Sequence, residues 1–552
     1  MTLRCPLLPS RPGWSRFLAL VCGLLILRGL AVLSLYPPGE GFDELQHIAY
    51  LTHLNETGEI PVLGETLVPL SVHPIIASVP HADISWRQTR IMGGVRYRHF
   101  WDVTPETAID QRVLLFQAQH PPLFYKLTAP LYLHLLDHYG FLPALYTLRI
   151  LQILIGALAL ALLLYPLRDI LGDSPHTRAL ALVISLLPMY LIYILRVSND
   201  ALAVLFAALI FLLLARLQTP SRLYLTAFLC GLLLTAGAMT KTIAFLFLPV
   251  ILGYFACLFL FDRSFPRHHL IFASLIVVGI YLAIATPYHL HNYQAFGTPF
   301  PALETIINAE KGHGTRDLLA TIRFSDLSTF FFHRLVTMNL WTSGMTFLRP
   351  TAASEHLWSF IIALGIFGLA YALARPAVAI LRKQKSFPAS LPPPPQLRFI
   401  ALCLLTVLFT FLGAYAHALN CRLAWGAVIT PPYYVMVAYP AFLTLIYLGY
   451  RAIEPRMVPL LFLWFLGLLF LSTEILALTR IAVPYWAATD SWSQAVQRLT
   501  QIHPAFPPPR HYLLLLALSF PLLLLALRAL FLPPPANQTT STLTQSPAPD
   551  PS

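Results

Sequence analysis

Acidic and basic side chains stand at the ends of long apolar runs in this sequence, where they could act on a polar substrate at a membrane surface. Asp43 and Glu44 follow the first of these runs, and His47 lies one helical turn beyond Asp43 if a helix begins near residue 42. Adjacent carboxylates beside a span are costly unless something uses their charge, and a carboxylate can serve as a general base. The alternative is that Asp43 only caps the start of the helix.

A second polar motif covers residues 119–126 and places His120 directly before Pro121 and Pro122, with Tyr125 close behind. The double proline fixes the entry to a helix and holds the preceding residues extended. We therefore expect His120 at a rigid corner near the membrane surface. A structural turn without a chemical role is the alternative.

Three further polar residues stand where apolar runs meet or end. Asp200 follows Arg196 in a short link, where it could equally cap a helix. Lys241 follows Thr240 in another link, and it could snorkel to the interface or bind a phosphate as a point charge. Asn292 lies in a polar segment directly after a further run.

The elements that position these residues are membrane spans. Of the 552 residues, 57% are hydrophobic and 11% are charged, whereas soluble proteins carry about 25% charged residues. A span needs about 20 mostly apolar residues. The matching runs are near 16–35, 144–166, 179–197, 200–217, 223–240, 242–261, 269–287, 356–375, 399–418, 428–450, 457–478 and 511–532. We predict an all-α, polytopic transmembrane helical bundle of about 12 spans, with interfacial helices in the first external loop.

The basic residues predict how the bundle is oriented. The net charge is +12, but the Lys and Arg residues are spread among short loops, which is typical of a membrane protein and excludes a nucleic-acid-binding surface. The run 121–139 is ambiguous because it contains several polar residues. If it lies along the membrane surface, the basic loops and both termini share the cytoplasmic side. The segments 36–143, 288–355 and 480–509 then lie outside.

This orientation brings the polar motifs to one face of the membrane. The residues that fall at the external boundary are Asp43, Glu44, His120, Asp200, Lys241 and Asn292. Each has a structural explanation when it is taken singly. Carboxylates, a lysine and histidines at a single interface together suit a site for a lipid phosphate and a sugar.

The cysteines give no sign of a metal site or a disulfide framework. The six cysteines include no CxxC motif and have no metal-like spacing, and most lie inside apolar runs. We expect them to be small hydrophobic residues, and we expect no cofactor. A divalent metal is compatible with the proposed chemistry but not required by it.

The order of the motifs resembles that of the GT-C glycosyltransferases, especially the dolichyl-phosphate-mannose protein mannosyltransferase and aminoarabinose transferase families and their bacterial relatives. The similar elements are Asp43-Glu44, His120-Pro121-Pro122-Leu123, Ser198-Asn199-Asp200, Thr240-Lys241 and the stretch from Asn292 to Pro299. They cover about residues 15–300. His291 and Phe296 replace the Arg and Tyr that are commoner in the family, and the second half aligns only loosely, so it contributes no predicted site residue.

The resemblance implies an inverting transfer of a hexosyl or pentosyl group from a polyprenyl-phosphate donor to an acceptor hydroxyl on the outer face, as in cell-envelope glycosylation. It implies Asp43 as the general base, with Glu44 orienting the acceptor or the base. Further roles follow for a larger set: Lys241, His120 and Asn292 would bind the donor phosphate, and His47, Asp200 and Tyr125 would bind substrate. The expected partners are the lipid-linked sugar donor, the bilayer and a glycan, lipid or protein acceptor, with no nucleic acid.

On this basis residues 1–300 form the catalytic transmembrane module, residues 301–532 a C-terminal transmembrane region, and residues 533–552 a disordered cytoplasmic tail. We expect a bacterial plasma membrane protein with its active site outside, or an endoplasmic reticulum protein if the chain is eukaryotic. A transporter or flippase is the main alternative, because Arg28 lies within the first span. A non-catalytic scaffold that binds lipid-linked intermediates is another.

Overall fold

The computed structural model describes residues 12–72, 114–331, 336, 339–344, 348, 350–381, 394–426, 432–453, 457–487, 489, 491–503 and 507–531. In these residues the regular structure is helical, apart from one isolated bridge between Leu67 and Leu114. The tail after residue 532 and the proline-rich residues 386–393, both predicted to be cytoplasmic, lie outside the described residues.

The helices of the first half are α1 (Pro12–Leu33), α2 (Glu44–Thr57), α4 (Leu123–Tyr139), α5 (Phe141–Leu171), α6 (Pro175–Ser185), α7 (Pro188–Ile194), α8 (Asp200–Ala215), α9 (Leu223–Thr240), α10 (Phe247–Phe261) and α11 (Arg267–Phe296). Those of the second half are α12 (Leu303–Glu310), α13 (Thr315–Ala320), α14 (Phe324–Thr329), α15 (Ala352–Leu381), α16 (Pro394–Trp425), α17 (Tyr439–Ile453), α18 (Met457–Ala477), α19 (Val483–Ala487), α20 (Trp492–Ile502) and α21 (Tyr512–Phe531).

The prediction of an all-α membrane bundle is confirmed. In the described residues, 10 helices are long and apolar enough to cross a membrane, the pair α6 and α7 passes the same test together with a bend of 50° between the two, and α8 is a shorter apolar helix. Each of the predicted runs corresponds to one of these elements. The amphipathic run 121–139 forms α4, which is not among the spanning helices, as expected for a helix that lies along the surface.

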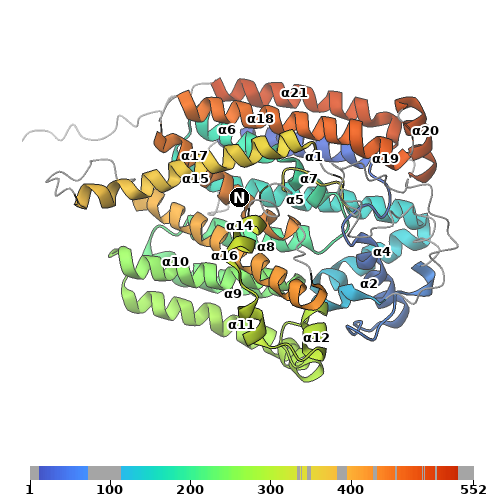
Figure 1. The fold of residues 1–552 in the computed structure, drawn as a ribbon, viewed down its shortest axis with the longest axis horizontal. Coiled ribbons are helices and arrows are strands. Elements are labelled where there is room, and N and C mark those ends of the chain that lie inside the picture. The colour runs from blue at the N-terminus through green and yellow to red at the C-terminus, as the bar shows by residue number, and fades with distance from the viewer. Residues whose placement is uncertain are drawn as a thin grey trace, which may run out of the picture.

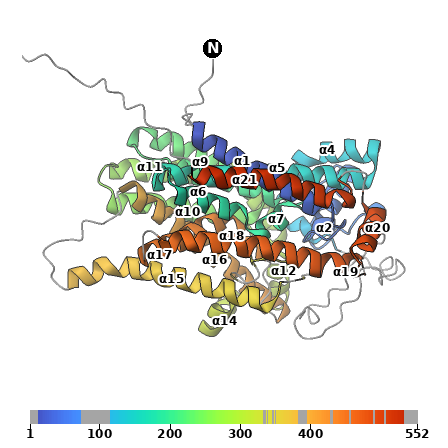
Figure 2. The same ribbon diagram turned by 90° about the horizontal axis from the view of Figure 1, so that it is seen from above.

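The long helices lie side by side, and the polar elements gather at one end of the bundle. Figure 1 shows α2, α4 and α20 together at this end, on the right of the view. The beginning of α1 and the end of α21 lie at the opposite end (Figure 2). We call the first of these ends the α2/α4 end. It holds the motifs predicted to be extracytoplasmic, and the side of the membrane that it faces stays a prediction.

The two predicted regions share one hydrophobic core, which extends from Trp14 to Leu530. Helix α21 packs along α1, and α16 packs on α10 and α8. The region after residue 300 therefore lies directly against the first half. The division at residue 300 stays a prediction.

A buried arginine holds the bent pair α6 and α7 together. The helix is interrupted between them because Leu187, directly before Pro188, has a non-helical backbone conformation (φ −55°, ψ 115°), so main-chain carbonyls at the end of α6 need other donors. Arg28 of α1 donates hydrogen bonds to the carbonyls of Ser185 (2.9 Å) and Leu186 (3.2 Å) and pairs with Glu474 of α18. Arg28, which favoured a transporter in the sequence, thus has a structural role here.

Helices α15 and α17 approach each other through glycines. A Cβ atom on Gly449 would lie 2.0 Å from the carbonyl oxygen of Gly365, and one on Gly368 would lie 2.3 Å from the carbonyl oxygen of Gly449. Small residues allow this close backbone contact, which is a common way for helices to associate in membranes.

We therefore predict that Gly449→Ala destabilises the protein, because the added methyl group must push α15 away from α17. Overpacking of this kind costs about 1–3 kcal/mol. The measurement is the unfolding midpoint of the detergent-purified protein. Gly279→Ala on α11 is the control, since no atom lies within 4 Å of the added methyl group. Equal midpoints for the two variants would contradict the glycine contact.

Candidate active site

The loop between α1 and α2 places Asp43 in an unusual backbone conformation. Asp43 is the N-cap residue of α2 with φ of 56°, and among the described residues no other non-glycine residue has a positive φ. Its side chain makes no capping hydrogen bond, so the structure contradicts the simple side-chain cap. Such backbone outliers cluster at functional sites.

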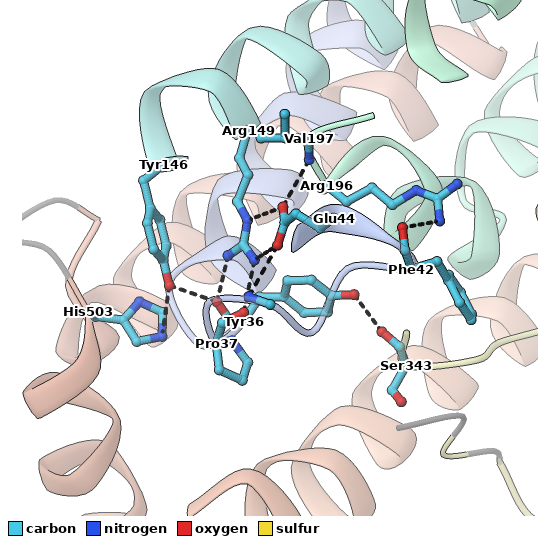
Figure 3. A network of polar contacts seen from close by, with 11 residues as sticks. Tyr36, Pro37, Phe42, Glu44, Tyr146, Arg149, Arg196, Val197, Ser343 and His503 are labelled. Atoms are coloured by element: carbon cyan, nitrogen blue, oxygen red, sulfur yellow. Dashed lines mark hydrogen bonds and ion pairs between the residues drawn. The ribbon is translucent and has the colours of Figure 1, made fainter. Parts of the chain in front are cut away.

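Glu44, the first residue of α2, lies in a closed set of hydrogen bonds (Figure 3). Its carboxylate accepts from Nε of Arg149 (2.8 Å) and Nη2 of Arg149 (2.5 Å), and from the amides of Gly39 (3.2 Å) and Val197 (2.9 Å). Both Glu44 and Arg149 are fully buried. Glu44 was predicted to orient the acceptor or the base. Its oxygens already accept from these donors, so of the two predicted roles, orientation of the base fits this geometry better than orientation of the acceptor.

Arg149 fixes the loop that carries Asp43. Its two terminal nitrogens donate to the carbonyls of Tyr36 and Pro37, each at 2.9 Å, while Tyr146 also donates to the carbonyl of Tyr36 (2.8 Å). The sequence prediction missed Arg149. Its signal was present, because an arginine within an apolar run is rarely there without a polar partner.

The Asp200 carboxylate lies between the side chains of Arg196 and Lys241, and all three residues are buried. Its carboxylate pairs with Arg196 through one oxygen and with Lys241 through the other. It begins α8, whose N-cap residue is Asn199. Asp200 is therefore not the N-cap residue, which contradicts the alternative that it acts only as a cap. The ion pair orients Lys241, and the predicted contact of Asp200 with substrate stays a prediction.

Hydrogen bonds from side chains to main-chain carbonyls hold three distant segments around these three charged residues. Asn199 donates to the carbonyl of Thr240 (2.9 Å), which joins the α7–α8 link to the end of α9. Arg196 donates to the carbonyl of Phe42 (3.1 Å), directly before Asp43. The Asp43 loop and the Asp200–Lys241 pair are thus built on one framework.

His120 and His47 face each other beside these charges. His120 is extended (φ −91°, ψ 143°) between a short 3-10 helix and α4, which confirms the predicted corner. The two imidazole rings are nearly parallel, with centroids 6.1 Å apart, and Nδ1 of His47 is hydrogen-bonded to the Tyr125 hydroxyl at 2.8 Å. Nδ1 of His120 is buried and has no hydrogen-bond partner among the described residues.

Burial keeps both imidazoles neutral. It lowers the pKa of His47 well below its usual value, with His120 acting in the same direction. It lowers the pKa of His120 to about 3, with the Lys241 ammonium adding to the effect. At neutral pH these side chains can donate and accept hydrogen bonds, but they bring no positive charge.

Asp43 and Lys241 share this environment. Burial lowers the pKa of Lys241, and the Asp200 and Asp43 carboxylates act in the opposite direction. Burial also raises the pKa of Tyr125, and both of these carboxylates reinforce that shift. The carboxylate and the lysine from distant parts of the chain therefore lie within electrostatic reach of each other, as the sequence predicted.

Asn292 lies at the edge of the site. It is buried near the end of α11, and its amide nitrogen is 3.3 Å from the carbonyl oxygen of Pro299. It also bonds the Tyr288 hydroxyl, which lies within electrostatic reach of Tyr50 and Tyr125. Its contacts hold the chain after α11 in place, and its predicted contact with phosphate stays a prediction.

The second half of the chain contributes residues that the sequence analysis did not assign. The Tyr434 ring centroid is 5.4 Å from Nζ of Lys241. Tyr434 lines a cavity of about 30 Å³ together with Asp200, Lys241 and Thr410, whose buried hydroxyl has no hydrogen-bond partner among the described residues. No motif marks Tyr434, because its position depends on how the two halves pack.

No family model and no curated protein matches this sequence. Among solved structures it is similar to ArnT from Cupriavidus metallidurans bound to undecaprenyl phosphate, with 14% identity and a TM-score of 0.42 over 94% of this chain and 76% of that chain. It is also similar to the oligosaccharyltransferase AglB from Archaeoglobus fulgidus in complex with an inhibitory peptide and a dolichol-phosphate, with 13% identity and a TM-score of 0.44 over 90% of this chain and 60% of that chain.

A second Archaeoglobus fulgidus oligosaccharyltransferase structure, tethered with an acceptor peptide, matches with 13% identity and a TM-score of 0.43 over 92% of this chain and 59% of that chain. The chain thus spans about three fifths of the oligosaccharyltransferases. These neighbours are GT-C glycosyltransferases, the superfamily that the motifs resemble.

We predict that Arg149→Met destabilises the protein strongly, because it leaves the buried Glu44 carboxylate without its cation. Breaking a buried pair costs about 3–5 kcal/mol. The measurement is denaturant unfolding in detergent, as a double-mutant cycle with Glu44→Gln. The double variant should lose less than the two single losses combined, and Arg222→Met at an exposed position should lose little. Additive losses would contradict the pairing.

We also predict that stability falls as pH falls below about 6.5, the ordinary histidine pKa. The pKa of His120 is lowered in the folded protein, so the unfolded chain binds more protons than the folded chain in this pH range. The free energy of unfolding therefore falls by up to about 1.4 kcal/mol for each pH unit. His120→Gln should flatten the slope of unfolding free energy against pH. His138→Gln, at an exposed site on α4, should leave it unchanged. An unchanged slope in His120→Gln would exclude a buried neutral His120.

Proposed function

We propose that this chain is a membrane glycosyltransferase that moves a sugar from a polyprenyl-phosphate donor to an acceptor hydroxyl at the extracytoplasmic face. The observation that carries the proposal is the convergence of Asp43 with the buried Asp200–Lys241 pair at the α2/α4 end. A base, a cation and neutral hydrogen-bonding groups in one partly desolvated place are what the transfer requires.

The charges at this site favour an anionic ligand. Arg196 and Lys241 share the single carboxylate of Asp200, so these three side chains together carry one formal positive charge, and the Asp43 carboxylate lies within electrostatic reach of Lys241. Such a charge interacts strongly with an anion because the surroundings have a low dielectric constant. A phosphate carried on a prenyl chain would place its anion here while the chain stays in the bilayer beside the spans.

The proposed reaction is a single displacement. The acceptor hydroxyl oxygen attacks the anomeric carbon of the sugar and forms the new glycosidic bond, while the bond from that carbon to the phosphate oxygen breaks. Asp43 takes the hydroxyl proton, and the phosphate leaves with the bonding electron pair. The anomeric configuration inverts because attack and departure occur on opposite sides of the ring.

The remaining residues position or stabilise these groups. Lys241, oriented by Asp200, offers its ammonium to the leaving phosphate, and His120 offers a hydrogen bond from a neutral ring. His47 and Tyr125 form the adjoining wall, where a sugar hydroxyl would bind. Glu44 acts through Arg149 by holding the Asp43 loop. Asn292 is assigned to the far edge of the phosphate site.

Transport and enzymatic transfer are separated by one experiment. Purified protein in vesicles is supplied with radiolabelled polyprenyl-phosphate sugars. Movement of label between leaflets without formation of a glycosylated product would favour the flippase alternative. Transfer of label to an acceptor in detergent, where no leaflets exist, would favour the enzyme.

We predict that Asp43→Asn lowers the rate of sugar transfer by about 10²–10⁴-fold, the usual contribution of a general base, and leaves donor binding intact. Lys241→Met should weaken donor binding, because it removes a cation from the phosphate site. The measurements are transfer of labelled sugar and binding of the labelled donor.

The matched controls lie on the neighbouring helix α4, where Asp137→Asn and Lys126→Met change exposed side chains of the same type. Both should transfer sugar at the wild-type rate. Transfer by Asp43→Asn at the rate of Asp137→Asn would remove Asp43 from the role of base.

A further inference from the structure

A cluster of three metal-ligating side chains lies beside the candidate active site, and the proposed reaction does not use it. Glu304 of α12 meets His417 and Cys421 of α16, and one ligand atom from each lies within 4.8 Å of the other two. We propose that these residues form a binding site for one divalent cation of the zinc class. The proposal stands independently of the glycosyltransferase activity.

The spacing on α16 suits a shared metal. His417 and Cys421 are four residues apart, so their side chains lie on one face of the helix. The Cys421 sulfur lies 3.5 Å from Nδ1 of His417. Two ligands of a tetrahedral ion with bonds of about 2.0–2.3 Å are separated by nearly this distance, so little movement is needed to admit the ion.

Helix α12 is fixed so that Glu304 completes the set. Asn308 donates to the carbonyl of Asn420 (3.1 Å), and Nζ of Lys311 donates to the carbonyl of Ala424 (2.6 Å). These bonds hold α12 against the last turns of α16. Glu304, one turn before Asn308, is itself hydrogen-bonded to the Cys421 thiol.

The types of ligand select the metal. A thiolate and an imidazole favour Zn²⁺ over Mg²⁺ or Ca²⁺, which prefer oxygen ligands. Three protein ligands leave one tetrahedral position open, as in sites where the metal also binds a small molecule or substrate. On binding, Cys421 would lose its proton to solvent and coordinate as the thiolate.

The environment of Cys421 distinguishes it from another cysteine on the same helix. Cys403 is buried within the hydrophobic core, as expected of a structural cysteine, whereas Cys421 faces a carboxylate and an imidazole. The sequence spacing gave no sign of the site, because one ligand lies more than a hundred residues from the other two and no short motif encloses all three.

The site adjoins the candidate active site through one aromatic ring. The centroid of Tyr434 is 4.8 Å from that of His417, and Nζ of Lys241 lies 5.4 Å from the same tyrosine ring. A bound cation would therefore link α12 and α16 next to Tyr434, the same residue whose ring lies near Lys241.

The test is a titration of the detergent-purified full chain with Co²⁺ after removal of bound metal with a chelator. The wild type should bind one equivalent and develop the near-ultraviolet band of a thiolate-to-cobalt transition, and Zn²⁺ should displace the cobalt. Cys421→Ser should abolish the band. Cys403→Ser, on the same helix, should keep it.

Glu304→Gln provides a variant at a partly exposed position, which is useful if Cys421→Ser does not fold. It should weaken Zn²⁺ binding by more than about 100-fold, since even residues that only orient metal ligands contribute about 10–100-fold. Size-exclusion chromatography checks that each variant is folded. Wild-type protein that binds no Co²⁺, or Co²⁺ binding that is unchanged in Glu304→Gln, would overturn the proposal.

Discussion

The structure of the site depends on the cost of burying charge in a membrane protein. A charge removed from water must be paired and hydrogen-bonded, because the desolvation of each ion costs several kcal/mol. This constraint produces two linked units: Glu44 with Arg149, and Asp200 with Arg196 and Lys241. Each unit joins segments far apart in the sequence. The position of Asp43 follows from both, since Arg149 holds the loop before it and Arg196 holds the carbonyl beside it.

The two units have different chemical consequences. The Glu44–Arg149 pair is internally balanced, so it orders the loop without leaving a charge for a ligand. The Asp200 set has one cation more than it has carboxylates, so it can still attract an anion. His47 and His120, kept neutral by burial, add hydrogen-bonding groups without adding charge. Tyr434 adds a residue from the second half of the chain to this place, since its ring lies beside Lys241.

Much of this arrangement could be predicted from the sequence because membranes impose strong rules. Apolar run length identified the spans, and the bias of basic loops separated α4 from them. The same topology brought Asp43, His120 and Lys241 to one end. The partners of Glu44 and Asp200 could not be predicted in this way, because a motif shows that a charge is present but not which distant side chain neutralises it. Tyr434 and the Glu304 cluster depend on helix packing, for which no periodicity in the sequence gives a signal.

The central claim is that Lys241, beside Asp43, binds the phosphate of a lipid-linked sugar. The most direct measurement is an experimental structure of the protein with a polyprenyl phosphate bound. We predict phosphate density within hydrogen-bonding distance of Nζ of Lys241 and of the His120 ring, with the prenyl chain running along the spans. Phosphate density elsewhere, such as in the apolar groove of about 480 Å³ beside Arg28 and Glu474, with the Lys241 site empty, would contradict the claim.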